Sequence, residues 1–137
     1  MAVTIKRIYE PAVAADGTRI LVDRLWPRGV SKARAKLAFW MKDIAPSPKL
    51  RVWFGHRPER FTEFSRRYRK ELAPNAAVDE LRKLARREPV TLLYAAHDPK
   101  INHAAVLQAV LRGRSSRAAP KLARQAAKRQ RATVPAR

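Results

Sequence analysis

The sequence contains no cysteine. This absence excludes disulfide bonds, thiolate nucleophiles and metal sites built on cysteine. The only imidazoles are those of His56, His97 and His103. We therefore expect neither a bound metal ion nor a cofactor.

Glycine is scarce, and long apolar runs are absent. The four glycines, at positions 17, 29, 55 and 113, are isolated, so the chain has no glycine-rich phosphate loop and nucleoside triphosphate hydrolysis is disfavoured. No stretch approaches the roughly 18 apolar residues of a membrane span. Residues 1–7 also lack the apolar block of a secretory signal. These observations predict no membrane span and a cytoplasmic location.

Acidic residues are few and confined to one part of the chain. The 137 residues include 11 acids against 31 lysines and arginines, a formal net charge of +20. All the acids lie between Glu10 and Asp98, whereas residues 112–137 carry nine basic residues and no acid. The preceding residues still hold 22 basic side chains. Such a charge attracts nucleic acid, phosphate-bearing metabolites or an anionic membrane surface.

Length and composition fit one small domain followed by a tail. A content of 46% hydrophobic residues is enough for a single modest core. Beyond Gly113 the only large apolar residues are Leu122 and Val134, too few to offset the entropy of ordering. We therefore expect an α/β domain over residues 1–112 and a disordered basic tail over 113–137.

The tail carries basic residues at spacings of 4, 3, 4 and 3. They would form one stripe if the segment became helical against a polyanion. Nine cations without an acid predict nonspecific, salt-dependent binding of nucleic acid. The members of the stripe are Arg117, Lys121, Arg124, Lys128 and Arg131.

Three segments have the character of strands. Residues 4–9 alternate apolar and polar side chains, residues 19–23 are a short apolar run bounded by charge, and residues 90–96 are the near-continuous apolar run of a strand covered on both faces. The first two segments are nine residues apart, which favours an antiparallel pair, because a parallel crossover usually needs a dozen residues or more.

Helical patterns separate these strands. Ser31 can cap a short helix through Ala38, while residues 45–48 are expected to be irregular. An amphipathic helix is predicted from Pro58 through residue 72, and a second one, capped by Asn75, ends before residue 89. Asp98 followed by proline predicts the cap of a last helix that runs to Gly113. The order predicts an α/β fold, a small three-layer sandwich with a mostly parallel sheet and flanking helices.

Polar loops follow two of the predicted strands, and in open parallel sheets ligands bind beyond the carboxyl ends of the strands. If the two strands are parallel neighbours, these loops form one crevice for an anionic or phosphorylated small molecule, with arginine as a forked donor, tryptophan as a stacking face, and Asp23 or His103 as a titratable group. The candidate ligand-binding residues are Asp23, Arg24, Trp26, Arg28, Asp98, Asn102 and His103.

Structural roles compete with this interpretation. Asp23 could pair with Arg24 or Arg28 and fix the loop, His103 could be a hydrogen-bonded core residue, and Asp98 could serve only as a helix cap. Two other functions also stay open. One is a nucleic-acid-binding accessory protein that uses its tail, and the other is a structural or interaction module with tryptophans 26, 40 and 53 exposed. Neither a reaction nor an oligomeric state follows from the sequence.

Several motifs together resemble a known family. They are Asp-Arg-Leu-Trp-Pro-Arg-Gly at 23–29, Ala-Pro-Ser at 45–47, Leu-Arg-Val-Trp-Phe at 50–54, Phe-Ser-Arg-Arg-Tyr-Arg-Lys-Glu-Leu at 64–72 and Leu-Leu-Tyr-Ala-Ala at 92–96 with Asn102. The chain is similar to the YeaO-like branch of the bacterial family called domain of unknown function 488, over about residues 3–112.

The resemblance implies an uncharacterised cytoplasmic α/β protein, and it favours a shortened parallel crossover between the first two strands. Wider members of the family carry a cysteine in the late strand and a Cys-His-Arg run at the following helix. Tyr94 and Asn102-His103-Ala104 occupy those places here, so only His103 matches. The resemblance therefore implies no sulfur chemistry for this chain.

Overall fold

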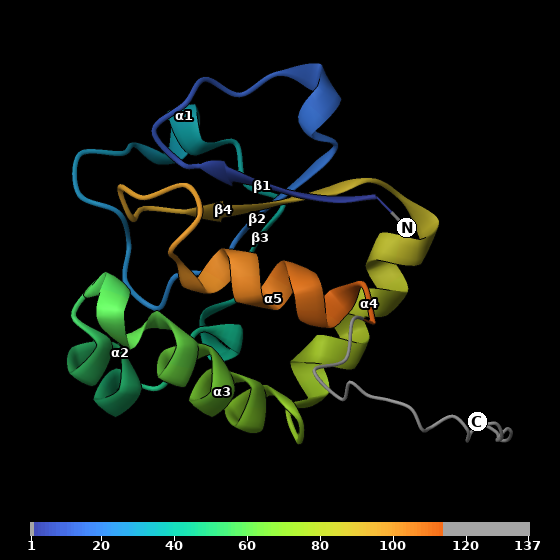
Figure 1. The fold of residues 1–137 in the computed structure, drawn as a ribbon. Helices are drawn as coiled ribbons and strands as arrows, with labels where there is room; N and C mark the ends of the chain where they lie inside the picture. The colour runs from blue at the N-terminus through green and yellow to red at the C-terminus, as the bar shows by residue number, and fades with distance from the viewer. Residues whose placement is uncertain (1, 114–137) are drawn as a thin grey trace, which may run out of the picture.

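The computed structural model describes residues 2–113. A four-stranded sheet lies at its centre in the order β1-β4-β2-β3 (Figure 1). The strands are β1 (Val3–Arg7), β2 (Thr18–Leu21), β3 (Phe39–Trp40) and β4 (Val90–Tyr94). Each of the three neighbouring pairs is parallel. The expected α/β fold with a parallel sheet is confirmed.

The first two strands are not neighbours, because β4 lies between them and pairs with both. The prediction of an antiparallel pair was therefore wrong. The shortened parallel crossover that the resemblance implies is present, because β1 and β2 both run parallel to β4. The ten residues between β1 and β2 cross over β4, where the Thr91 hydroxyl donates to the Asp16 carbonyl, and they end beside the start of β4, where the Thr18 N–H donates to the Pro89 carbonyl at 3.0 Å. β4 is thereby covered by a strand on each side, as its continuous apolar run indicates.

Most of the helical mass covers one face of the sheet. The helices are α2 (Pro48–Phe54), α3 (Phe61–Leu72), α4 (Ala76–Arg87) and α5 (His103–Leu111). α5 packs directly on β1 and β4, and α3 packs against α5 (Figure 1). Alternate residues of the strands, including Val3, Ile20 and Leu92, point into this larger core.

The opposite face has a thinner cover. It consists of the four-residue helix α1 (Lys32–Ala35), the 3-10 helix η1 (Ala14–Asp16) and their loops (Figure 1). A smaller core forms there around Leu21 and Leu93, with Trp26 and Trp40 packed against it. The two flanking layers are thus unequal. Two further 3-10 turns are η2 (Lys42–Ile44) and η3 (Pro58–Arg60).

Local capping explains where the helices begin. The side chains of Ser31 and Asn75 accept hydrogen bonds from the first turns of α1 and α4, as predicted. Ser47 does the same for α2, a helix that the sequence interpretation did not predict. The last helix begins at His103 and not at residue 99, because Asn102 is its cap. Asp98 is therefore not a helix cap.

Within residues 2–113, no helix is long and apolar enough to cross a bilayer. The predicted tail stripe falls outside the described residues. Its members are Arg117, Lys121, Arg124, Lys128 and Arg131.

Candidate functional site

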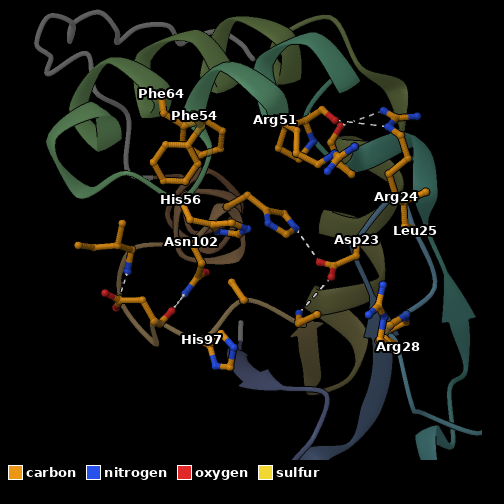
Figure 2. Close-up of a pocket in the computed structure, with 18 of the residues that line it drawn as sticks. Asp23, Arg24, Leu25, Arg28, Arg51, Phe54, His56, Phe64, His97 and Asn102 are labelled. Atoms are coloured by element: carbon orange, nitrogen blue, oxygen red, sulfur yellow. Dashed lines mark hydrogen bonds and ion pairs between the residues drawn. The ribbon is translucent and has the colours of Figure 1, made fainter.

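A cavity of about 520 Å³ opens at the carboxyl ends of β2 and β4 (Figure 2). Its walls come from the loops that follow these two strands, from residues 45–46, and from α2 and α3. All seven residues that were expected to form a crevice line this cavity. Their role in binding is a proposal. They are Asp23, Arg24, Trp26, Arg28, Asp98, Asn102 and His103.

Asp23 and His103 meet at the base of the cavity. Nε2 of His103 lies 3.0 Å from the Val22 carbonyl oxygen and 3.1 Å from Oδ1 of Asp23. Both neighbours accept hydrogen bonds, so Nε2 carries the proton, and its N–H is directed at the Val22 carbonyl. Oδ2 of Asp23 accepts from the Ala95 N–H at 3.0 Å. Asp23 therefore joins the loops after β2 and β4, and the alternative that it pairs with an arginine was wrong.

Arg24 positions a wall of the cavity. Its guanidinium donates through Nη2 to the Ala45 carbonyl at 3.2 Å and through Nε to the Pro46 carbonyl at 3.4 Å (Figure 2). The side chain is half-buried. Two of its five N–H groups are directed at backbone, so Arg24 is held in one orientation and retains donors for a ligand.

Arg28 and Arg51 are exposed at the rim of the same cavity. Within residues 2–113, neither guanidinium has a hydrogen bond, ion pair or aromatic contact. An unpaired guanidinium keeps its full set of planar donors, which match phosphate and carboxylate oxygens. Arg51 was missed by the sequence interpretation because it lies on the unpredicted helix α2.

All three histidines of the chain line the cavity. His56 and His97 are exposed and His103 is half-buried. His56 follows the C-cap of α2 and has a φ of 58°, a left-handed conformation that residues other than glycine seldom adopt. Neither His56 nor His97 was among the candidates. The Ser47-Pro48 pair, a serine cap followed by proline at the first helical position, is the signal that could have revealed α2 and hence His56.

The loop after β4 is stabilised by side-chain caps. Oδ1 of Asp98 accepts from the backbone N–H groups of Lys100 and Ile101 at 2.8 and 3.0 Å. These two hydrogen bonds hold the pKa of Asp98 below its usual value. Asn102 donates to the Asp98 carbonyl at 2.8 Å and is almost fully buried. The carboxylate of Asp98 is thus occupied by its own loop.

The three tryptophans are half-buried and have partners. The Trp26 indole donates to the Val30 carbonyl at 2.7 Å and packs edge-on against Trp40, with ring centroids 5.3 Å apart. Trp53 lies under the guanidinium groups of Arg60 and Arg67. None of the three indoles is fully exposed, which is less exposure than the alternative of an interaction module assumed.

No group of three or more His, Asp or Glu side chains within residues 2–113 is arranged to hold a metal ion. The fold and the cavity define a small parallel α/β domain with a ligand-sized site at the carboxyl ends of its strands.

The comparisons place this domain in a family. Residues 2–131 match the family model described as the inactive DUF488-N3 subclade, and the chain belongs to the DUF488 family. The match extends beyond residue 112, where the resemblance was expected to end. An uncharacterized protein of Mycobacterium tuberculosis is 48% identical over 112 residues, which cover 82% of this chain and 95% of the relative. The uncharacterized protein YeaO of Escherichia coli is 43% identical over 113 residues, covering 82% and 98%. No solved structure matches.

Proposed function

We propose that this protein binds a small anionic molecule, such as a phosphorylated metabolite, in the cavity at the carboxyl ends of β2 and β4. The observation that carries the proposal is the gathering of three arginines and all three histidines on one cavity. Two of these arginines, Arg28 and Arg51, have no partner within residues 2–113. Of the two acids of the cavity, Asp98 accepts from backbone N–H groups of its own loop. Oδ2 of Asp23 accepts from the Ala95 N–H, whereas its Oδ1 is buried beside His103 without a hydrogen bond.

The size of the cavity supports a small ligand. Sites for metabolites and drug-sized molecules are commonly about 300–1,000 Å³, and the volume of about 520 Å³ falls in this range. The fixed guanidinium of Arg24 and the free groups of Arg28 and Arg51 would approach an anion from different loops. Charge-assisted hydrogen bonds of this kind are roughly twice as strong as neutral ones.

Binding without catalysis is favoured over an enzymatic role. The Ser47 hydroxyl, which lies near the cavity, donates to Oε2 of Glu71 at 2.6 Å and caps α2, so it is not poised as a nucleophile. The buried Tyr68 hydroxyl donates to the Ile44 carbonyl at 2.6 Å. The description of the matching subclade as inactive agrees with a binding role.

The test is ligand binding by thermal shift and calorimetry with inorganic phosphate and a panel of sugar phosphates. The double variant Arg28→Gln/Arg51→Gln should weaken binding about 10-fold or more, because it removes charge-assisted hydrogen bonds. A matched control is Arg86→Gln/Arg87→Gln, which removes the same charge from the exposed end of α4, away from the cavity. If no ligand distinguishes the parent protein from the cavity variant, the proposal fails.

Nucleic-acid binding is a second candidate, favoured by the net charge of +20 and by the basic face of α3. A shallow hollow runs along this face, lined by Thr62, Ser65, Arg66, Arg69, Lys70 and Ala73. Contacts with phosphates would make the affinity fall steeply with salt. The test of this candidate is to measure DNA and RNA affinities from about 50 to 200 mM salt. The full chain is compared with a chain that ends at residue 113. Affinity that is unchanged by the truncation would remove the tail from the interaction.

A further inference from the structure

The two sides of the cavity differ in the chemistry of their side chains. This difference indicates that the site recognises a second feature of its ligand besides negative charge. In Figure 2, Phe54, Phe64 and His56 lie together on one side, whereas Arg24, Arg51 and Arg28 lie on the other. A ligand that fills the cavity therefore meets rings at one end and guanidinium groups at the other.

The aromatic side is a stack of rings held by the core. The ring centroids of Phe54 and Phe64 are 4.2 Å apart and the planes are inclined by 18°. Both side chains are buried and line the cavity. The His56 ring lies 6.0 Å from the Phe54 ring and is tilted by 51° to it, so the group of rings extends to an exposed residue at the rim. Aromatic rings in such a wall are complementary to another planar ring packed by offset or edge contact.

The backbone at His56 is strained in a way that serves this wall. Gly55 and His56 are consecutive left-handed residues, with φ values of 51° and 58°. Glycine adopts this conformation without steric cost, whereas a residue with a Cβ does so against its preference. Strained residues concentrate at ligand sites, where the surrounding structure holds a side chain in place. The turn after α2 holds the imidazole of His56 at the edge of the cavity.

The arginine side of the cavity is suited to the anionic group of a ligand. Arg24 is fixed by the carbonyls of residues 45 and 46, and Arg51 lies on the same side of the cavity (Figure 2). A single phosphate or carboxylate group placed there would meet planar donors, and the rest of the molecule would extend toward Phe54 and His56.

From this arrangement we propose that the ligand is an aromatic anion, a planar ring joined to one phosphate or carboxylate group, with His56 and Phe54 recognising the ring. This inference rests on the proposed function, because it assigns the class of anion bound at the same cavity.

The experiment titrates the full-length protein by calorimetry with four probes: inorganic phosphate, phenyl phosphate, phenylacetate and benzyl alcohol. Phenyl phosphate should bind at least 10-fold more tightly than inorganic phosphate, because it adds ring contacts to the same anion. Benzyl alcohol should bind much more weakly than phenyl phosphate, because it lacks the charge. The ratio of phenyl phosphate to phenylacetate affinity shows which anionic group the site prefers.

A matched pair of variants assigns the ring preference to one side of the cavity. His56→Asn and His97→Asn make the same chemical change at two exposed rim positions, and asparagine tolerates the left-handed conformation of position 56. His56→Asn should lower the ratio of phenyl phosphate to inorganic phosphate affinity several-fold. His97→Asn should change the two affinities by the same factor and so leave their ratio unchanged.

The outcomes separate this inference from the proposed function. If inorganic phosphate binds in an Arg28-dependent and Arg51-dependent manner and phenyl phosphate binds no more tightly, the inference is overturned and the proposed function stands. An equal fall of the ratio in both histidine variants would also overturn the inference. If none of the four probes binds, or if benzyl alcohol binds as tightly as phenyl phosphate, the inference is overturned. The proposed function fails as well if the sugar phosphates show no binding that depends on Arg28 and Arg51.

Discussion

Two groups of charged side chains on this small domain behave in opposite ways. Beneath η1, on the thinly covered face of the sheet, the carboxylate of Asp16 accepts hydrogen bonds from Lys6 at 3.0 Å, from Arg19 at 2.6 Å and from the Val13 N–H at 3.0 Å. At the rim of the cavity, Arg28 and Arg51 have no partner within residues 2–113. The first group is paired within the chain, although Nη2 of Arg19 has no hydrogen-bond partner, and the second is open to a ligand.

Burial explains the difference. Arg19 and Asp16 are only 5% and 7% exposed, so leaving either charge unpaired would carry a large desolvation penalty. Arg19 also donates from Nε to the Ala35 carbonyl at 2.9 Å, which ties α1 to β2. The exposed rim arginines remain hydrated and need no internal partner to fold. Charge type alone therefore does not identify a candidate binding residue, whereas a charge without a partner beside a cavity does.

The largest effect should follow from Asp16→Ala, which leaves Lys6 and Arg19 without their shared carboxylate. Removal of one partner from a buried ion pair typically costs about 3–5 kcal/mol of unfolding free energy, which urea denaturation measures. Glu63→Ala is the control, because Glu63 pairs with Arg66 and Arg67 at a solvent-exposed position. A similar loss for both variants would erase the distinction between the buried cluster and a surface ion pair.

Stability should also fall at acid pH because of Asp16. Burial opposes ionisation of this carboxyl, but the hydrogen bonds from Val13, Lys6 and Arg19 outweigh it and lower the pKa of Asp16. The folded form therefore holds the proton less readily than the unfolded chain. The contribution is complete above the unfolded pKa of about 4, and it is lost as the pH falls through the folded pKa.

Urea titrations between about pH 6 and pH 2, around the unfolded pKa, would measure this effect in the parent protein and in Asp16→Asn. Because the exposed Glu63 carboxylate, with its pKa lowered to about 2, adds a dependence of the same sign, the titrations should be run in high salt, which screens exposed pairs more than buried ones. An equal acid slope in parent and variant would show that Asp16 is not the responsible group.

The buried cluster of Lys6, Asp16 and Arg19 and the cavity differed in how far they could be predicted from the sequence. The cavity loops were predicted because they follow strands with strong apolar patterns, 19–23 and 90–96, and because the carboxyl ends of parallel strands share one edge. The cluster was not predicted. Its members meet only because η1 folds back over the sheet, a tertiary arrangement without a local pattern.

The errors within the site have related physical causes. β3 has two residues and α2 has seven, too short for a period to be read. Because α2 was not predicted, Arg51 and His56 were not recognised as candidate residues. Asp98 and Asn102 are both good caps, and the helix begins after Asn102 because its Oδ1 accepts from the Ala105 N–H at 2.8 Å. The position of β4 between β1 and β2 depends on contacts between residues about 70 to 90 apart, such as Thr18 with Val90 and Val3 with Val90.

A smaller effect on the free energy of unfolding should come from His56→Gly. This variant tests whether His56 contributes to folding or to binding. Release of the left-handed strain favours the folded state by about 1–2 kcal/mol. The greater freedom of glycine in the unfolded chain offsets about 0.5–1 kcal/mol of this. We expect a net gain of up to about 1.5 kcal/mol in unfolding free energy, combined with weaker binding of phenyl phosphate.

His56→Ala is the control for this substitution, because it removes the imidazole and keeps the strain, and it should give no gain in stability. A His56→Gly protein that is less stable than the parent would mean that packing of the imidazole near Phe54 outweighs the strain. His56 would then have a structural role, as Asp16 and Arg19 do.

The smallest effect on stability should come from Arg28→Gln/Arg51→Gln. Both side chains are exposed and unpaired within residues 2–113, so the free energy of unfolding should change by no more than about 0.5 kcal/mol. Relief of repulsion in a chain of net charge +20 would make the change favourable. Arg19→Gln is the contrasting variant, because it disrupts the ion pair with Asp16 and the hydrogen bond to the Ala35 carbonyl. If the two rim substitutions destabilise the protein as much as Arg19→Gln does, the rim arginines are structural, and their location beside the cavity no longer supports a role in binding.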